Sequence, residues 1–150
     1  MKQTLLLAGV LLSLSLAASA AEQTLLLRQP SVSRDTLVFV YAGDIWTANH
    51  DGSSPRRITS AEVNESSPRI SPDGSMIAFA AAYENNLDVY VIATSGGQPR
   101  RLTWHPGSDT PMGWSADSQS VTFVSARETD HGRSGQLFVV PLTGGLPAKQ

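Results

Sequence analysis

Residues 68–79 read PRISPDGSMIAF, and residues 111–123 read PMGWSADSQSVTF. Each stretch starts with a proline-led segment, continues through a turn and ends in an apolar run. The aspartates of the two turns, Asp73 and Asp117, are 44 positions apart. Self-similarity at a fixed period of this size is typical of repeat architectures, in which one supersecondary unit recurs along the chain.

The same interval of 44 relates other landmarks. Asp44-Ile45-Trp46 corresponds to Asp88-Val89-Tyr90, and Arg56-Arg57-Ile58-Thr59 corresponds to Arg100-Arg101-Leu102-Thr103. A more degenerate copy begins at Pro30. We therefore expect a short lead-in segment and then a repeat region at 30–150, with the following bounds: lead-in 21–29, and repeats at about 30–59, 68–103 and 111–150.

Within one period the pattern predicts strands only. Apolar residues alternate over 76–81 and again over 87–92, which is the period of a β-strand. Ser71-Pro72-Asp73-Gly74 suits a type I turn, with proline second and glycine fourth. Gly96-Gly97 and Gly144-Gly145 mark later turns and lack the following helix that a phosphate-binding loop needs.

Four short strands in about 44 residues is the size of a β-propeller blade. We predict an all-β fold, an incomplete β-propeller with two four-stranded blades plus a partial third. Residues 68–103 should form one four-stranded antiparallel sheet with a turn at Pro72-Asp73. A small β-sandwich is the alternative fold. Because propeller rings typically close with about 4 to 8 blades, this chain alone should leave apolar sheet faces uncovered.

Residues 1–20 have the layout of a signal peptide. Lys2 precedes an apolar run at 5–16, and Ala18-Ser19-Ala20 offers small residues for cleavage. The apolar run is shorter than the ~20 residues that a membrane span needs. We therefore expect an exported, periplasmic protein with no stable membrane span once the signal is removed.

The composition excludes several classes of function. The 150 residues include no cysteine, so there is no disulfide, thiol nucleophile or cysteine-based zinc site. Without Lys2 the chain has 10 basic and 13 acidic side chains. A nucleic-acid-binding domain is expected to be basic, with clustered Lys and Arg, so we expect no nucleic-acid partner.

Candidate catalytic residues are few. His50, His105 and His131 fall in three different expected loops, without the spacing of metal ligands. His105, in Trp104-His105-Pro106 between two repeats, is the histidine best placed for a ligand, because loops often carry function. No Gly-x-Ser-x-Gly nucleophile motif is present. We therefore assign no catalytic, cofactor-binding or metal-binding residue and expect no cofactor.

Two repeated features allow a functional and a structural interpretation. Asp73 and Asp117 could act as a carboxylate pair, but their equivalent turns favour bonding to nearby backbone. The pairs Arg56-Arg57 and Arg100-Arg101 could bind a peptide carboxylate or a phosphate. Their recurrence with the period favours a structural position on the last strand of each repeat.

The repeat resembles the propeller repeat of the TolB type, through its Ser-Pro-Asp-Gly turn, its Asp-Val-Tyr-Val strand and its Arg-Arg-Leu-Thr segment. Three stretches are more specifically similar to the first propeller of tricorn protease homologues: 41–46 (YAGDIW), 102–109 (LTWHPGSD) followed by 113–115 (GWS), and 137–141 (LFVVP) leading to 144–147 (GGLP). The third turn, Ser115-Ala116-Asp117-Ser118, departs from the pattern because it lacks both proline and glycine.

The tricorn resemblance implies a six-bladed amino-terminal propeller that gates or filters peptides and unfolded polypeptides. It also implies a second propeller, a PDZ domain and a serine protease core beyond Gln150, in a protein that forms homo-oligomers. This chain would then be the non-catalytic opening of an exported serine peptidase. Two alternatives remain, a TolB-like periplasmic protein-binding propeller and the propeller cap of a prolyl-oligopeptidase-like hydrolase.

Overall fold

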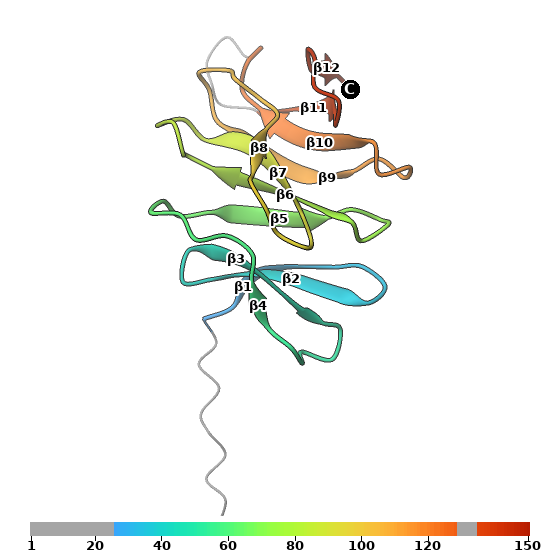
Figure 1. Cartoon of the computed structure of the whole chain (residues 1–150). Coiled ribbons are helices and arrows are strands. Elements are labelled where there is room, and N and C mark those ends of the chain that lie inside the picture. Colours follow the sequence, from blue (N-terminus) through green and yellow to red (C-terminus); the bar gives the residue numbers. More distant parts are fainter. Residues whose placement is uncertain (1–25, 129–134) are drawn as a thin grey trace, which may run out of the picture.

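The computed structural model describes residues 26–128 and 135–150, which form β-strands and turns and contain no helix (Figure 1). The expected signal peptide at 1–20 lies outside the described residues. Within the described ranges no helix is long and apolar enough to cross a membrane. The strands are β1 Arg28–Val32, β2 Thr36–Tyr41, β3 Asp44–Asn49, β4 Arg56–Arg57, β5 Ser66–Ile70, β6 Met76–Ala81, β7 Asp88–Ala93, β8 Arg100–Arg101, β9 Asp109–Trp114, β10 Ser120–Ser125, β11 Gln136–Pro141 and β12 Ala148–Lys149.

These strands build three separate four-stranded antiparallel sheets, in which each strand pairs with its neighbour in the sequence: β1 to β4, β5 to β8 and β9 to β12. Figure 1 shows the sheets following one another in sequence order, from β1–β4 at the bottom to β9–β12 at the top. The predicted all-β fold, an unclosed β-propeller, is confirmed. Three sheets in succession do not form the two-layered sandwich that was the alternative.

The turn between β2 and β3 is a tight hairpin. The strands pair from Thr36↔Asn49 to Tyr41↔Asp44, which leaves only Ala42 and Gly43 in the loop. Their φ angles are 52° and 89°, both positive, as a type I′ turn requires. A Cβ at Gly43 would lie 2.5 Å from Asn64 Oδ1, so close packing also favours glycine there.

The second sheet, β5 to β8, agrees with the prediction for residues 68–103. It is four-stranded and antiparallel, and Pro72 and Asp73 lie in the turn between β5 and β6. Gly74 in this turn has a φ of 75°. In the third sheet Ser118 takes the equivalent position with a φ of 61°, so the turn forms there without glycine.

The third sheet is fuller than the sequence indicates. It contains a fourth strand, because Ala148 and Lys149 pair with Val139 and Phe138 of β11. Two residues suffice, since β4 and β8 are equally short. Gln150 follows β12 as Leu102 follows β8, because the N–H of Gln150 donates to the carbonyl of Leu137 as that of Leu102 donates to Val89.

Two apolar cores lie between the sheets. The first packs Val38, Val40 and Ile45 of the first sheet against residues of the second that include Ile77 and Phe79. The second core packs the other face of the second sheet against the third, and its members are Ala78, Val89, Val91, Leu102, Val121, Phe123, Phe138 and Val140. Burial on both faces explains why β6 and β7 are apolar at nearly every position.

The first strands of the three sheets, β1, β5 and β9, are edge strands that lie beside one another. Each contains a proline: Pro30, Pro68 and Pro111. Each also shows a register shift against its partner strand close to that proline. These strands form a continuous wall on the side where the sheets converge.

Candidate functional site

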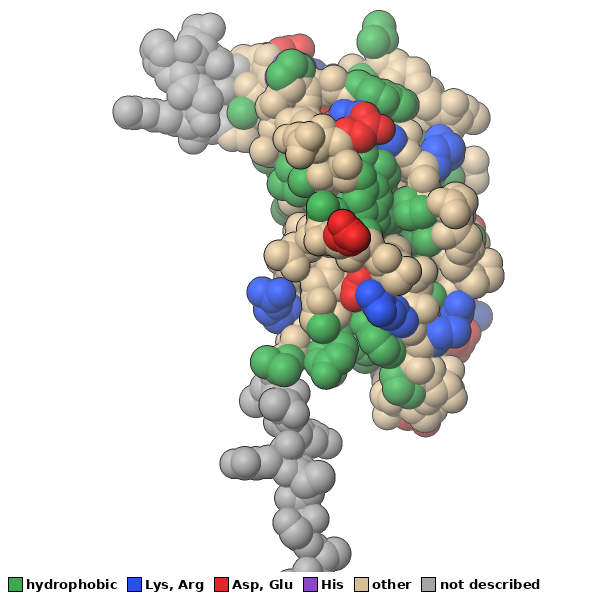
Figure 2. Space-filling view, turned by 60° about the vertical axis from the view of Figure 1, so that its left-hand side comes forward, with side chains coloured by type: hydrophobic (Ala, Val, Ile, Leu, Met, Phe, Trp, Pro, Cys, Tyr) green, Lys and Arg blue, Asp and Glu red, His purple; other side chains and the backbone are tan. Residues whose placement is uncertain are grey.

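The most distinctive polar groups lie at the two junctions between successive sheets. The first junction, between the first and second sheets, contains Thr59, Glu65 and Tyr83. The second junction, between the second and third sheets, contains Asp109 and Arg127. Figure 2 shows that acidic and basic side chains are interspersed on the side of the molecule that it presents, without a field of one sign. This distribution does not provide the basic stripe of a nucleic-acid-binding surface.

Glu65 connects the first sheet to the second. It directly precedes β5, and the residue is only 2% exposed. It accepts hydrogen bonds from the hydroxyl of Thr59, the hydroxyl of Tyr83 and the backbone N–H of Ile45, the last at 3.1 Å. Thr59 and Ile45 belong to the first repeat, so the carboxylate holds the two sheets in register.

Burial raises the pKa of the Glu65 carboxyl, and the hydrogen bonds from Thr59 and Tyr83 lower it by a smaller amount. Burial and the bond to Glu65 both raise the pKa of the Tyr83 phenol. The phenol therefore stays protonated and acts as a donor to the carboxylate.

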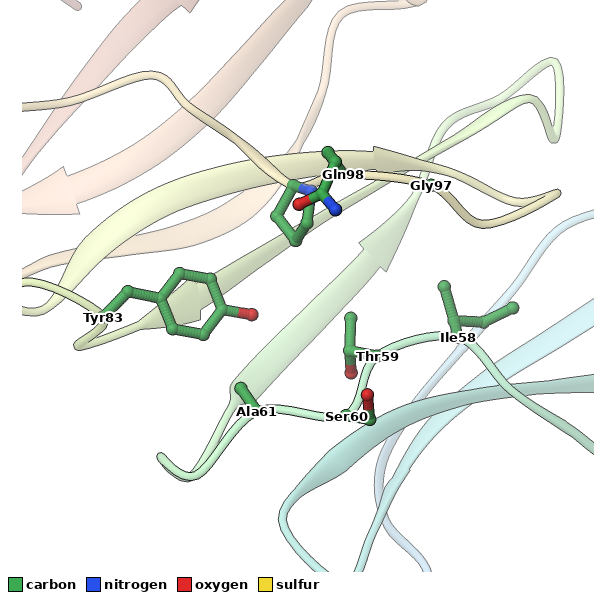
Figure 3. Close-up of a pocket in the computed structure, with 8 residues that line it drawn as sticks. Ile58, Thr59, Ser60, Ala61, Tyr83, Gly97 and Gln98 are labelled. Atoms are coloured by element: carbon green, nitrogen blue, oxygen red, sulfur yellow. The ribbon is translucent and has the colours of Figure 1, made fainter.

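A cleft of about 410 Å³ opens beside this group, between the first and second sheets (Figure 3). In Figure 3 the hydroxyl of Tyr83 points into the space bounded by Thr59, Ser60 and Gln98. The lining offers hydroxyl and amide groups but contains no histidine or acid. It can therefore hydrogen-bond a polypeptide backbone but offers no general base. The lining residues are Ile58, Thr59, Ser60, Ala61, Tyr83, Gly97, Gln98 and Pro99.

At the second junction an ion pair takes the equivalent place, within the third repeat. Arg127 Nη2 lies 2.6 Å from Asp109 Oδ2, and the two side chains are 13% and 0% exposed. The guanidinium also lies over the rings of Phe123 and Phe138, at 5.0 Å from each centroid. This geometry combines a buried ion pair with two cation–π contacts.

The repeated arginine pairs have structural contacts. Arg57 binds Asp44 at 2.7 Å, and Arg101 binds Asp88 at 2.5 Å, so each links the fourth strand of its sheet to the third. Arg56 donates to the carbonyl oxygens of Thr94 and Ser95, in the second sheet. These bonds support the structural interpretation of the arginines over an anion site.

The two described histidines lie in different connections. His50 is exposed in the β3–β4 turn, and His105 is partly buried in the connection from β8 to β9. His105 Nδ1 accepts a hydrogen bond from the N–H of Gly107 at 2.9 Å, and this local bond stabilises the turn. His131 lies outside the described residues. Among residues 26–128 and 135–150, no group of three or more His, Asp or Glu side chains could hold a metal ion.

Asp73 and Asp117 each cap their own turn and do not form a carboxylate pair. Asp73 Oδ1 accepts from Ser71 Oγ at 2.5 Å and from the N–H of Ser75 at 3.0 Å. Asp117 makes the equivalent bonds to Ser115 and Gln119. The hydrogen bond from the Ser71 hydroxyl, with those from Ser75, lowers the pKa of Asp73 to about 2.

Neither junction was predicted from the sequence. Glu65 and Asp109 are 44 positions apart, and so are Tyr83 and Arg127, so the repeat period carried the signal. It was hidden because the residue types differ, a carboxylate with a phenol in one junction and a carboxylate with a guanidinium in the other. The assignment of no catalytic, cofactor-binding or metal-binding residue stays a prediction.

Comparison with known proteins identifies the fold and the family. The sequence model of the tricorn protease N-terminal β-propeller domain matches residues 24–150. Tricorn protease homolog 1 of Streptomyces coelicolor is 31% identical over 120 residues, which cover 79% of this chain and 11% of that protein. The chain thus spans about a tenth of the length of this relative.

Solved structures agree on the fold. The crystal structure of the tricorn protease aligns with a TM-score of 0.69 at 23% identity, covering 79% of this chain and 12% of that chain. A putative TolB from Agrobacterium tumefaciens aligns with a TM-score of 0.68 at 22% identity, covering 83% and 45%. These alignments support a β-propeller that is incomplete in this chain. Together with the match over residues 24–150, they lead to one conclusion: the chain belongs to the tricorn protease N-terminal β-propeller family.

Proposed function

We propose that this chain is the opening propeller segment of an exported serine peptidase of the tricorn type. Its role would be to gate or filter peptides and unfolded polypeptides for a protease core outside this chain. The observation that carries the proposal is the family match over residues 24–150, with a relative of which the chain covers 11%. The chain itself would supply no chemistry, and its partners would be peptide substrates and the rest of a homo-oligomeric parent protein.

The wall of first strands supports a gating role. Propeller blades surround a central channel, and the innermost strands line it. Here the N–H of Ser67 donates to Gln29 Oε1 at 2.7 Å, which links β5 to β1. Arg69 Nε donates to the carbonyl of Met112 at 3.0 Å, and Trp114 Nε1 donates to the carbonyl of Arg69 at 2.8 Å. These bonds hold three strands as one firm surface, as a size-selective channel requires.

The test uses the full-length protein and the substitution Met112→Trp, which enlarges an exposed side chain on β9. A gate predicts that kcat/KM falls for a long unfolded polypeptide and stays unchanged for a short peptide, because only the long substrate is restricted by channel width. Equal losses for both substrates, or no loss for either, would contradict gating. Leu146→Trp, in the exposed turn between β11 and β12, is the control.

The TolB-like alternative is favoured by one observation, the alignment of this chain with a solved TolB structure at nearly the same TM-score as with the tricorn protease. Reading the gene past codon 150 distinguishes the two. A frame that continues into a second propeller and a peptidase core supports the tricorn proposal. A single propeller ring followed by a stop would favour a binding protein, and a following Gly-x-Ser-x-Gly domain would favour the hydrolase cap.

Export to the periplasm is a separate part of the proposal, and residues 1–20 support it by their sequence alone. Amino-terminal sequencing of the protein from a periplasmic extract tests it. We expect Ala21 to be the first residue. A product that retains Met1 in the cytosol would overturn the export proposal and leave the propeller assignment intact.

A further inference from the structure

The two junctions do not carry the same charges, although their positions correspond. Four positions at the first junction recur 44 residues later at the second: Asp44, Arg57, Glu65 and Tyr83 correspond to Asp88, Arg101, Asp109 and Arg127. At the second junction Arg101 binds Asp88 at 2.5 Å. Arg127 binds Asp109 at 2.6 Å, so each of these two buried acids has a guanidinium as its partner.

The first junction lacks one of these two positive charges. Arg57 pairs with Asp44 at 2.7 Å, but none of the ion pairs within residues 26–128 and 135–150 includes Glu65. The donors to the Glu65 carboxylate are two hydroxyl groups and a backbone N–H, all neutral. Asp44 Oδ1 is also buried without a hydrogen-bond partner in the described part of the chain. With Glu65 ionised, this junction therefore has one negative charge in excess.

Tyr83 takes the place of the missing guanidinium. The two rings beneath Arg127 are a cross-strand pair, and strand register makes Phe79 and Tyr90 the equivalent pair in the second sheet. The ring of Tyr83 lies 6.3 Å from Phe79 and 4.7 Å from Tyr90, measured between ring centroids. The phenol thus covers the same aromatic positions and binds the acid, but it brings no charge.

The cleft of about 410 Å³ between the first and second sheets opens at this point (Figure 3). Tyr83 and Thr59 both line it and both donate to Glu65, so a single hydroxyl group separates the cleft from the carboxylate. Because the Tyr83 proton is used by Glu65, the phenol oxygen faces the cleft as an acceptor. The exposed side chains of Ser60 and Gln98 add a hydroxyl and an amide oxygen. The cleft therefore combines acceptor oxygens with the field of an uncompensated carboxylate.

We propose that this cleft binds the guanidinium of an arginine side chain from a separate polypeptide, which supplies the positive charge that the first junction lacks. A guanidinium carries five N–H donors in one plane, which suits several acceptor oxygens, and the plane stacks on aromatic rings, as Arg127 does. The volume of the cleft is near the lower end of the range for ligand sites, as one long side chain requires. This inference rests on the comparison of the two repeats and does not depend on the proposed peptidase role.

Calorimetric titration of the full-length protein tests the proposal. The probes are a capped peptide of alanines with one central arginine and the same peptide with citrulline, which has nearly the same shape but no charge. The measurement is made at pH 8, which favours the ionised form of Glu65. We expect the arginine peptide to bind about tenfold tighter or more, because only it meets the buried carboxylate with a charge. Equal affinities, or no binding of either peptide, would overturn the proposal.

A matched pair of substitutions assigns this binding to the first junction. Glu65→Gln keeps the size of the side chain and removes its charge, so the affinity for the arginine peptide should fall to that for the citrulline peptide. Glu62→Gln, at an exposed acid in the same connection, should leave the affinity within about twofold of wild type, because its charge is screened by water. Wild-type binding by Glu65→Gln would place the arginine elsewhere and overturn the proposal.

A second pair of substitutions leaves the buried network intact and decides the matter if Glu65→Gln does not fold. Gln98→Lys, at an exposed position, introduces an ammonium into the cleft that competes with the ligand. This variant should lose the preference for arginine over citrulline. Gln98→Met, which is similar in length and neutral, should keep it. If both variants retain the wild-type preference, the arginine does not bind in this cleft and the proposal is wrong.

Discussion

The two junctions occupy the same place in successive repeats but are held by different chemistry. In the first junction a buried carboxylate, Glu65, accepts hydrogen bonds from two hydroxyl groups and one backbone N–H. In the second, Asp109 is paired with a guanidinium that lies over two aromatic rings. The second and third sheets thus each have a buried acid at the start of their first strand, bound by neutral hydroxyl groups in one case and by a guanidinium in the other.

This difference gives the junctions different sensitivities. A buried ion pair that loses one partner leaves an uncompensated charge, which is costly. A carboxyl that is bound by hydroxyl groups can become protonated and keep much of its network. The second junction should therefore depend strongly on its partner residue, and the first should depend on pH.

The largest effect is expected from Arg127→Ala. Asp109 would remain fully buried without its counter-ion, and the cost should be about 3–5 kcal/mol of unfolding free energy. Urea titration measures this loss. Arg100→Ala, at an exposed arginine on β8, is the control and should change stability by less than about 0.5 kcal/mol. Similar losses for both variants would show that the ion pair does not stabilise the third sheet.

Removing both charges should cost less than removing one. The double variant Asp109→Asn with Arg127→Met leaves no orphan charge, so the double-mutant cycle should show a coupling of about 0.5–3 kcal/mol. Thermal and urea unfolding of the four proteins give this value. Strictly additive losses would mean that the two side chains act independently.

A smaller effect is expected at the first junction from Tyr83→Phe. The substitution deletes one hydrogen bond to the Glu65 carboxylate and should cost about 1.5–3 kcal/mol. Urea unfolding at neutral pH checks it, with Tyr41→Phe on the edge of β2 as the matched control. A loss as large as that of Arg127→Ala would remove the proposed difference between the junctions.

The smallest effect is the pH dependence of the first junction. The pKa of Glu65 is raised above its ordinary value of 4.5, so the folded state holds this proton more tightly than the unfolded state. The stability that protonation contributes is complete below 4.5 and decreases as the pH rises through the folded-state pKa. Melting temperatures of wild type and Glu65→Gln from pH 4 to 8 should diverge as the pH rises, because the wild type loses stability when Glu65 ionises and the neutral glutamine does not titrate. Parallel profiles would show that Glu65 does not titrate in this range.

The strands and turns were predictable because their signals are local. The apolar alternation of β6 and β7 is carried by a few neighbouring residues, and so is the Ser-Pro-Asp-Gly turn. The repeat period then relates these signals to their equivalents elsewhere in the chain. The Gly144-Gly145 turn indicated a fourth short strand, but Ala148 and Lys149 carry no pattern of their own, and the third blade was predicted to be only partial. The junctions were missed because each residue meets partners from other strands, and pairs such as Glu65 and Tyr83 resemble ordinary loop residues until the sheets are assembled.

The prolines of β1, β5 and β9 have a consequence for any extended polypeptide that passes along the converging edge of the sheets. An open strand edge attracts such a chain by adding it as a further strand. Pro30, Pro68 and Pro111 offer no N–H, and the nearby register shifts interrupt the ladder. A passing chain would find no continuous row of backbone donors and acceptors. It would therefore not be bound as an added strand and could move along these three strands.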